Sequence, residues 1–380
     1  MSRLKTRNSK YELLRVFSIC IIVLYHICYY GVIHNAGNAE LYYAGSQINS
    51  FFCSLTQPGG QVGVGIFFVI TGFFMRNTMP SDFFGGGYKK CIKIIEQVIF
   101  YSAISLLLMI AFIVTHKYSN YESISTTITS LIVTLFVPVS SGLWWFATAY
   151  VELLIITPFI NKTIESFNIK QFSVILLFIW GFWYAIGKFG THLYILYKAL
   201  FFYLVGAFIG RIISKNHIHL SKSMIKMLAA VSGIGSWSGF VFLDIYIRKI
   251  ELQSSLISYI AVNVAECLQS VFLVPICVIS IFLIFYYLPN FESKTINDMA
   301  SSTFAIYLLH DSFLIRSSLW NNIFAIPTIY EKQWFIIYSL GVVIILFLGG
   351  YTIDNFRKKY MDYLFKRCWK KIVFKFKNLK

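Results

Sequence analysis

The chain has 380 residues, of which 57% are hydrophobic and only 13% are charged. Together with a mean hydropathy of +0.68, this composition excludes an ordinary soluble domain and indicates a polytopic membrane protein. Lysine and arginine number 33 against 16 aspartate and glutamate residues, which gives a formal net charge of +17. The positions of the basic residues along the chain decide whether this charge reflects orientation in the membrane or binding of nucleic acid.

The apolar segments predict an all-α fold of about ten transmembrane helices in one bundle, most of them near the 20 residues that a bilayer requires. The predicted spans are residues 11–33, 62–79, 91–115, 143–161, 172–188, 194–213, 226–247, 266–288, 302–322 and 333–353. The apolar segment 125–139 is short, so a re-entrant or interfacial helix is an alternative to a further span there. We expect one membrane domain over residues 1–353 and a basic tail over residues 354–380.

The basic residues predict how these helices are oriented. With both termini in the cytoplasm, most Lys and Arg residues fall on the inner side, as the positive-inside rule demands. The outer side then receives only Lys117, Lys188, Lys198, Arg248, Lys249, Arg316 and Lys332. We therefore expect a multi-pass protein of the plasma membrane with cytoplasmic termini. The basic, aromatic tail is expected to lie on anionic membrane lipids rather than on nucleic acid.

The first predicted span carries titratable side chains in an otherwise apolar run. A charged side chain in hydrocarbon is costly and is kept there mainly for function. Arg15 and His26 are eleven residues apart, about three helical turns, so they share one helix face and differ in depth by roughly 16 Å. Glu12, one turn before Arg15, lies on the same face. The spacing predicts a cation at the membrane surface and an imidazole near mid-depth.

Segments of the first two predicted spans resemble the type-3 membrane acyltransferases. Arg15 and His26, with Glu12 before them, resemble the motif of that family's first helix. Residues 63–75, which read Gly-Val-Gly-Ile-Phe-Phe-Val-Ile-Thr-Gly-Phe-Phe-Met, resemble the family's Phe-Phe-x-x-Ser-Gly-Phe segment, with Thr71 in place of Ser. The two motifs occur in the family's order, on successive spans.

Three later segments extend this resemblance. Lys89, Lys90 and Lys93 resemble the basic run that opens the family's third span, although Lys stands where the family has Arg, which is the better bidentate phosphate ligand. Residues 145–161 and 302–320 are similar to the exopolysaccharide, capsule and O-antigen O-acetyltransferase branch. The similarity covers residues 10 to about 320.

The resemblance implies transfer of an acyl group, usually acetyl, from acetyl-CoA to a hydroxyl of a cell-envelope glycan or its lipid-linked precursor. The residues fit this chemistry, because a neutral imidazole suits a general base near pH 7 and cations suit the phosphates of CoA. The catalytic candidates are Glu12, Arg15 and His26, with His26 as general base or transient acyl carrier. The donor-binding candidates are Arg15, Lys89, Lys90 and Lys93, and the acceptor-binding candidates are Trp145, Tyr150, His310, Asp311 and Arg316. Acetyl-CoA is the only cofactor expected, and scattered cysteines and histidines indicate no metal site.

Other interpretations of these residues stay open at this point. His26 is also explained as a core histidine, and the lysines at 89–93 by the positive-inside bias alone. Trp145 and Tyr150 are also explained as part of an aromatic belt. A polysaccharide flippase or polymerase is an alternative function, as is a proton-linked transporter that uses His26 and Glu152.

Overall fold

The computed structural model describes residues 8–34, 41–119, 144–186, 191–214, 220–251 and 255–361. Every regular element among these residues is helical, and seven helices are long and apolar enough to cross a membrane. They are Ser9–Ile33, Gln47–Met75, Lys89–Val114, Leu193–Ser214, Lys222–Ile250, Leu256–Tyr286 and Phe335–Tyr360. The predicted all-α polytopic fold is confirmed, whereas the segment 125–139 lies outside the described residues.

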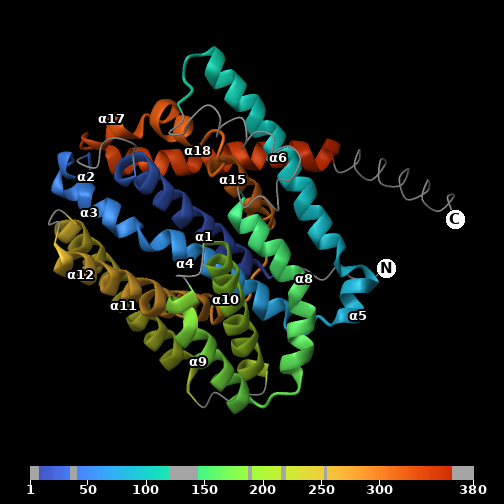
Figure 1. The fold of residues 1–380 in the computed structure, drawn as a ribbon. Coiled ribbons are helices and arrows are strands. Elements are labelled where there is room, and N and C mark those ends of the chain that lie inside the picture. Colours follow the sequence, from blue (N-terminus) through green and yellow to red (C-terminus); the bar gives the residue numbers. More distant parts are fainter. Residues whose placement is uncertain are drawn as a thin grey trace.

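Three helices form the centre of the bundle: α1 (Ser9–Cys28), α4 (Pro58–Met75) and α10 (Thr191–Ser214) (Figure 1). The other long helices are α6 (Lys89–Val114), α8 (Trp145–Glu165), α9 (Ile169–Ile186), α11 (Lys222–Glu251), α12 (Leu256–Cys267), α13 (Val274–Tyr286) and α18 (Phe335–Phe356). The short helices are α2 (Leu41–Ala44), α3 (Gln47–Thr56), α5 (Pro80–Asp82), α14 (Lys294–Ala300), α15 (Thr303–His310), α16 (Arg316–Ser318) and α17 (Ile326–Tyr330). The π-helical turns are η1 (Tyr29–Ile33), η2 (Phe83–Gly87), η3 (Leu268–Leu273), η4 (Leu319–Ile323) and η5 (Arg357–Met361).

Glycines allow α4 to approach its neighbours closely. A methyl group built on Gly72 would overlap the backbone carbonyl of Tyr203 on α10, and one built on Gly206 of α10 would overlap the carbonyl of Val69 on α4. Hydrocarbon supplies no hydrophobic force between helices, so small residues that let backbones meet are a main source of packing energy. These contacts fix α10 on one side of α4, with α1 on another.

The segment 302–322, which we predict as one span, is interrupted halfway. Helix α15 ends at His310, and regular helix resumes only at Arg316. Asp311 and Ser312 follow the break, and both residue types bond readily to nearby backbone and so favour helix ends. A broken helix at membrane depth is tolerated where protein surrounds it, and His310 and Asp311 are 0% and 3% exposed.

The end of α18 differs from the predicted tail. The helix continues into η5 across the expected boundary at residues 353 and 354, and Arg357 is buried in the bundle rather than free to lie on lipid. The cause is Asp354, which is 1% exposed and accepts a hydrogen bond of 2.9 Å from the Arg357 guanidinium. Residues 362–380 lie outside the described part of the chain.

Both ends of the described chain lie beside α14. The backbone N–H of Ser9 bonds to the carbonyl of Phe291 just before this helix, and the Lys358 ammonium bonds to the Ser301 hydroxyl just after it at 2.7 Å. The start of α1 and the end of α18 therefore lie on the same side of the bundle (Figure 1), as an arrangement with both termini on one side of a membrane requires.

We predict that Gly72→Ala destabilises the protein by about 1–3 kcal/mol, because the added methyl group meets rigid backbone of α10. The matched control is Gly341→Ala on α18, where a methyl group meets nothing within 4 Å and the better helix propensity of Ala favours the variant. The thermal midpoint of each purified variant in detergent, at one scan rate, is the measurement. Equal midpoints for the two variants would show that the α4–α10 contact is not tight.

Candidate active site

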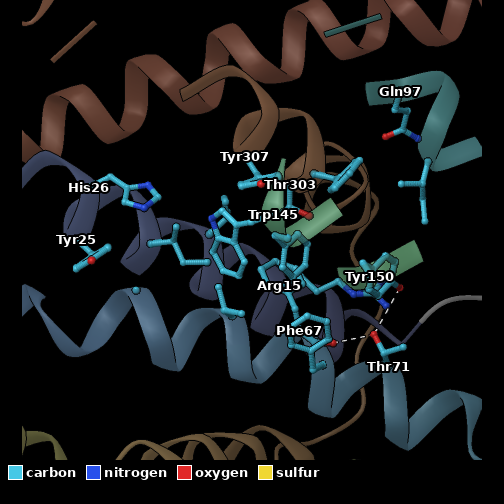
Figure 2. A pocket seen from close by; sticks show the side chains of 18 of the residues that line it. Arg15, Tyr25, His26, Phe67, Thr71, Gln97, Trp145, Tyr150, Thr303 and Tyr307 are labelled. Atoms are coloured by element: carbon cyan, nitrogen blue, oxygen red, sulfur yellow. Dashed lines mark hydrogen bonds between the residues drawn. The ribbon is translucent and has the colours of Figure 1, made fainter. Parts of the chain in front are cut away.

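A cavity of about 880 Å³ follows the face of α1 that carries Arg15 and His26 (Figure 2). Its walls come from α1, α4, α6, α8, α10, α15 and the end of α18. This volume is within the range of sites for sizeable ligands. The cavity places both residues of the first-helix motif on one continuous surface, Arg15 towards one end and His26 towards the other.

Cations gather at the Arg15 end of the cavity. Arg15, Lys93, Arg357 and Lys358 all line it. The Arg15 guanidinium bonds to both carboxylate oxygens of Glu12 at 3.0 Å, and the Glu12 side chain is only 8% exposed against 34% for Arg15. Glu12 thus lies behind Arg15 and orients it, and does not itself line the cavity.

The structure separates the predicted lysines. All three lysines are exposed, but Lys93 lines the cavity, whereas Lys89 and Lys90 do not. Lys89 and Lys93 are four residues apart and share a helix face, but Lys89 is the first residue of α6 and precedes the stretch 93–97 that lines the cavity. Lys90 is rotated by about 100° from Lys89, so only Lys93 faces the cavity. The run of basic residues does not by itself reveal which of them does.

Arg357 and Lys358 are cavity residues that we did not predict, since their basic neighbourhood is typical of a tail. Both are held by Asp354, which bonds to Arg357 at 2.9 Å and to Lys358 at 2.6 Å. The hydroxyls of Tyr101 and Ser302 donate to the same carboxylate at 3.2 and 3.0 Å. The signal in the sequence is the Asp at three and four residues before the two cations, a spacing that pairs charges on one helix face.

His26 and His310 form a hydrogen-bonded pair, with 2.9 Å between Nδ1 of His26 and Nε2 of His310. Nδ1 of His310 lies 2.6 Å from the Ile306 carbonyl oxygen, which can only accept, so in the neutral ring this nitrogen carries the hydrogen. Nε2 of His310 then accepts a hydrogen bond from Nδ1 of His26. Nε2 of His26 keeps its lone pair and has no partner within the described chain.

Asp311 and Arg316 support this pair from behind. The Arg316 guanidinium donates to the Tyr30 hydroxyl at 2.9 Å and to Asp311 at 3.3 Å, and it lies over the Tyr30 ring. That ring packs on His26 with 5.1 Å between centroids. The cavity wall therefore includes Tyr30 and His26, but not His310, Asp311 or Arg316, which we had predicted to bind the acceptor.

Trp145 and Tyr150 both line the cavity, but they do not share one end of it. The Tyr150 hydroxyl lies 3.5 Å from that of Thr71, and Figure 2 shows both beside Arg15. We expected Tyr150 in the outer half, near His310. The reason for the difference is that α8 starts deep in the bundle, where Trp144 donates to the Ser102 hydroxyl halfway along α6.

The fold and this cavity define a polytopic membrane protein with a buried imidazole pair at one end of a cation-lined chamber. A family model described as an acyltransferase domain, that of the type-3 family, matches residues 8–354. The chain therefore belongs to the type-3 acyltransferase family and is an acyltransferase. No curated protein and no solved structure matches the chain.

We predict that His310→Ala lowers the turnover number by roughly ten- to a hundredfold, because His26 loses the acceptor that holds its ring and tautomer. His310→Gln is the conservative variant, since its amide oxygen can accept from Nδ1 of His26, and it should recover part of the rate. Steady-state rates and thermal midpoints are the measurements. A purely structural role would lower the midpoints of both variants and give no rescue by Gln.

Proposed function

We propose that the protein transfers an acetyl group from acetyl-CoA, bound from the cytoplasm, to a hydroxyl of a cell-envelope glycan or its lipid-linked precursor. The observation that carries this proposal is the free Nε2 of His26 in a cavity whose far end is lined by four cations. Membership of an acyltransferase family favours this function over a polysaccharide flippase or polymerase.

The donor fits the cation-lined end. Acetyl-CoA carries several phosphate charges, which charge-assisted hydrogen bonds from Arg, and point charges from Lys, bind well. Arg15, Lys93, Arg357 and Lys358 converge on that end from three different helices. The pantetheine arm then runs along α1, over the roughly 16 Å that separates Arg15 from His26 in depth, and brings the thioester to the imidazole.

The imidazole supplies the acid–base step. Nε2 of His26 takes the proton of the acceptor hydroxyl while the hydroxyl oxygen attacks the thioester carbonyl carbon. The tetrahedral intermediate collapses, the C–S bond breaks, and the imidazolium returns its proton to the sulfur of CoA. The products are the O-acyl sugar and free CoA, and His26 is again neutral. Transfer through an acyl-histidine would use the same lone pair and would leave a trappable acyl-enzyme.

The acceptor fits the His26 end. Tyr25, Tyr29 and Tyr30 line the cavity there, and Trp145 faces it from α8. Aromatic side chains offer flat apolar faces together with polar edges, and they lose little rotamer entropy on contact with a ligand. Such a lining suits a sugar ring whose hydroxyl points towards His26.

We predict that His26→Ala abolishes transfer, a loss of about a thousandfold or more, while the protein still inserts and purifies. The physical reason is that no other described side chain offers a free imidazole nitrogen to the cavity. Release of CoA in the presence of a glycan acceptor is the measurement, with acyl-CoA binding as the control for an intact donor site. A variant that kept most of its turnover would remove His26 from the chemistry.

We predict that Lys93→Ala weakens acyl-CoA binding by roughly tenfold or more, the usual loss for a charge-assisted phosphate contact. Lys89→Ala and Lys90→Ala are the matched controls, because these lysines begin the same helix but do not line the cavity. Isothermal titration with CoA is the measurement. Equal dissociation constants for all three variants and the wild type would place the donor phosphates elsewhere.

A further inference from the structure

A fifth cation lines the cavity, away from the other four. Lys198 extends from α10, is half-buried and lines the chamber. Its ammonium donates a hydrogen bond of 3.0 Å to the side-chain oxygen of Gln61 on α4. No Asp or Glu is among the described residues that line this cavity, so the charge of Lys198 meets a neutral amide rather than a carboxylate.

Lys198 lies at the depth of His26. Its partner Gln61 follows Gly60, and a methyl group built on Gly60 would meet the ring of Tyr25. Tyr25 precedes His26 in α1, and the two rings lie 5.1 Å apart between centroids. Arg15 is three helical turns away, about 16 Å. The ammonium of Lys198 is therefore at the reacting end of the chamber, remote from the cations that suit the donor phosphates.

A lysine in this position needs an explanation. An ionisable side chain inside a membrane protein is expensive, and it normally faces a carboxylate, backbone carbonyls or a functional cavity. An ammonium group has three hydrogens to donate, and one of them forms the hydrogen bond to Gln61. The remaining donors border the chamber, where the surroundings are apolar and aromatic and an opposite charge would be strongly attracted.

We propose that Lys198 and Gln61 form a subsite for an anionic group of the acceptor, a carboxylate or a phosphate next to the hydroxyl that is acylated. This inference rests on the proposed function, because it places the acceptor at the His26 end. The ammonium neutralises the anion and the Gln61 amide donates to it, so that the sugar is held with its hydroxyl beside Nε2 of His26. A neutral sugar leaves the subsite unfilled and binds more weakly.

The test is acceptor binding to the full-length protein in detergent, without donor, so that it does not depend on turnover. The probes are an alkyl glucoside, the alkyl glucuronoside of equal chain length, and an alkyl glycosyl phosphate. We expect the wild type to bind at least one anionic probe about tenfold or more tightly than the neutral one. A preference for the uronoside identifies a sugar carboxylate as the anion, and a preference for the glycosyl phosphate identifies the phosphate of a lipid-linked precursor.

The variants are Lys198→Met, Lys198→Arg and the control Lys249→Met, which makes the same change at an exposed lysine of α11 that does not line the cavity. Lys198→Met should lose the preference for the anionic probe while its affinities for the neutral probe and for CoA stay the same. Lys198→Arg and Lys249→Met should keep the preference. Equal wild-type binding of neutral and anionic probes, or an undiminished preference in Lys198→Met, overturns the subsite. Normal probe binding without acyl transfer would instead overturn the proposed function.

Discussion

The hydrogen bond between His26 and His310 is the interaction on which the proposed chemistry depends. In a hydrogen bond between two neutral imidazoles, either ring can be the donor. The Ile306 carbonyl removes this choice, because it accepts a hydrogen bond from Nδ1–H of His310. The direction of the bond then follows, and His26 must present its Nε2 lone pair to the chamber. A main-chain oxygen on α15 thus determines which atom of His26 acts as the base in the proposed reaction.

This dependence explains why the helix break after His310 matters. The break is buried in the bundle, and the chain after it places the Arg316 guanidinium over the Tyr30 ring. Tyr30 and His310 both pack on the His26 ring, each with 5.1 Å between ring centroids, and these contacts limit the tilt of the ring. A continuous helix over 302–322 would have carried Arg316 about one and two-thirds turns beyond His310, instead of folding it back beside Asp311.

The sequence predicts the helical class, most spans and the positions on α1, because these depend on hydrophobic runs and on helical spacing. His26 and Arg15 face one cavity as expected, since eleven residues make nearly three whole turns. Contacts between distant segments could not be predicted in the same way. The partnership of His26 with His310, the inward turn of Arg357 and the inner position of Tyr150 all depend on where one helix starts or stops against another.

The two ends of the chamber differ in whether their cations are paired with carboxylates. At the Arg15 end, Glu12 pairs with Arg15, and Asp354 pairs with Arg357 and Lys358. Part of the positive charge is thereby balanced. In the proposed function, this balance lets the site exchange a highly charged donor without trapping it, since attraction in a low dielectric is otherwise very strong. At the His26 end, the Lys198 ammonium has only the neutral Gln61 amide as a hydrogen-bond partner among the described residues. In the proposed function, one cation without a carboxylate partner suits a single negative charge, whereas four cations, three of them paired with carboxylates, suit the several phosphates of CoA. The difference in charge balance would therefore keep each ligand at its own end, with the imidazole between them.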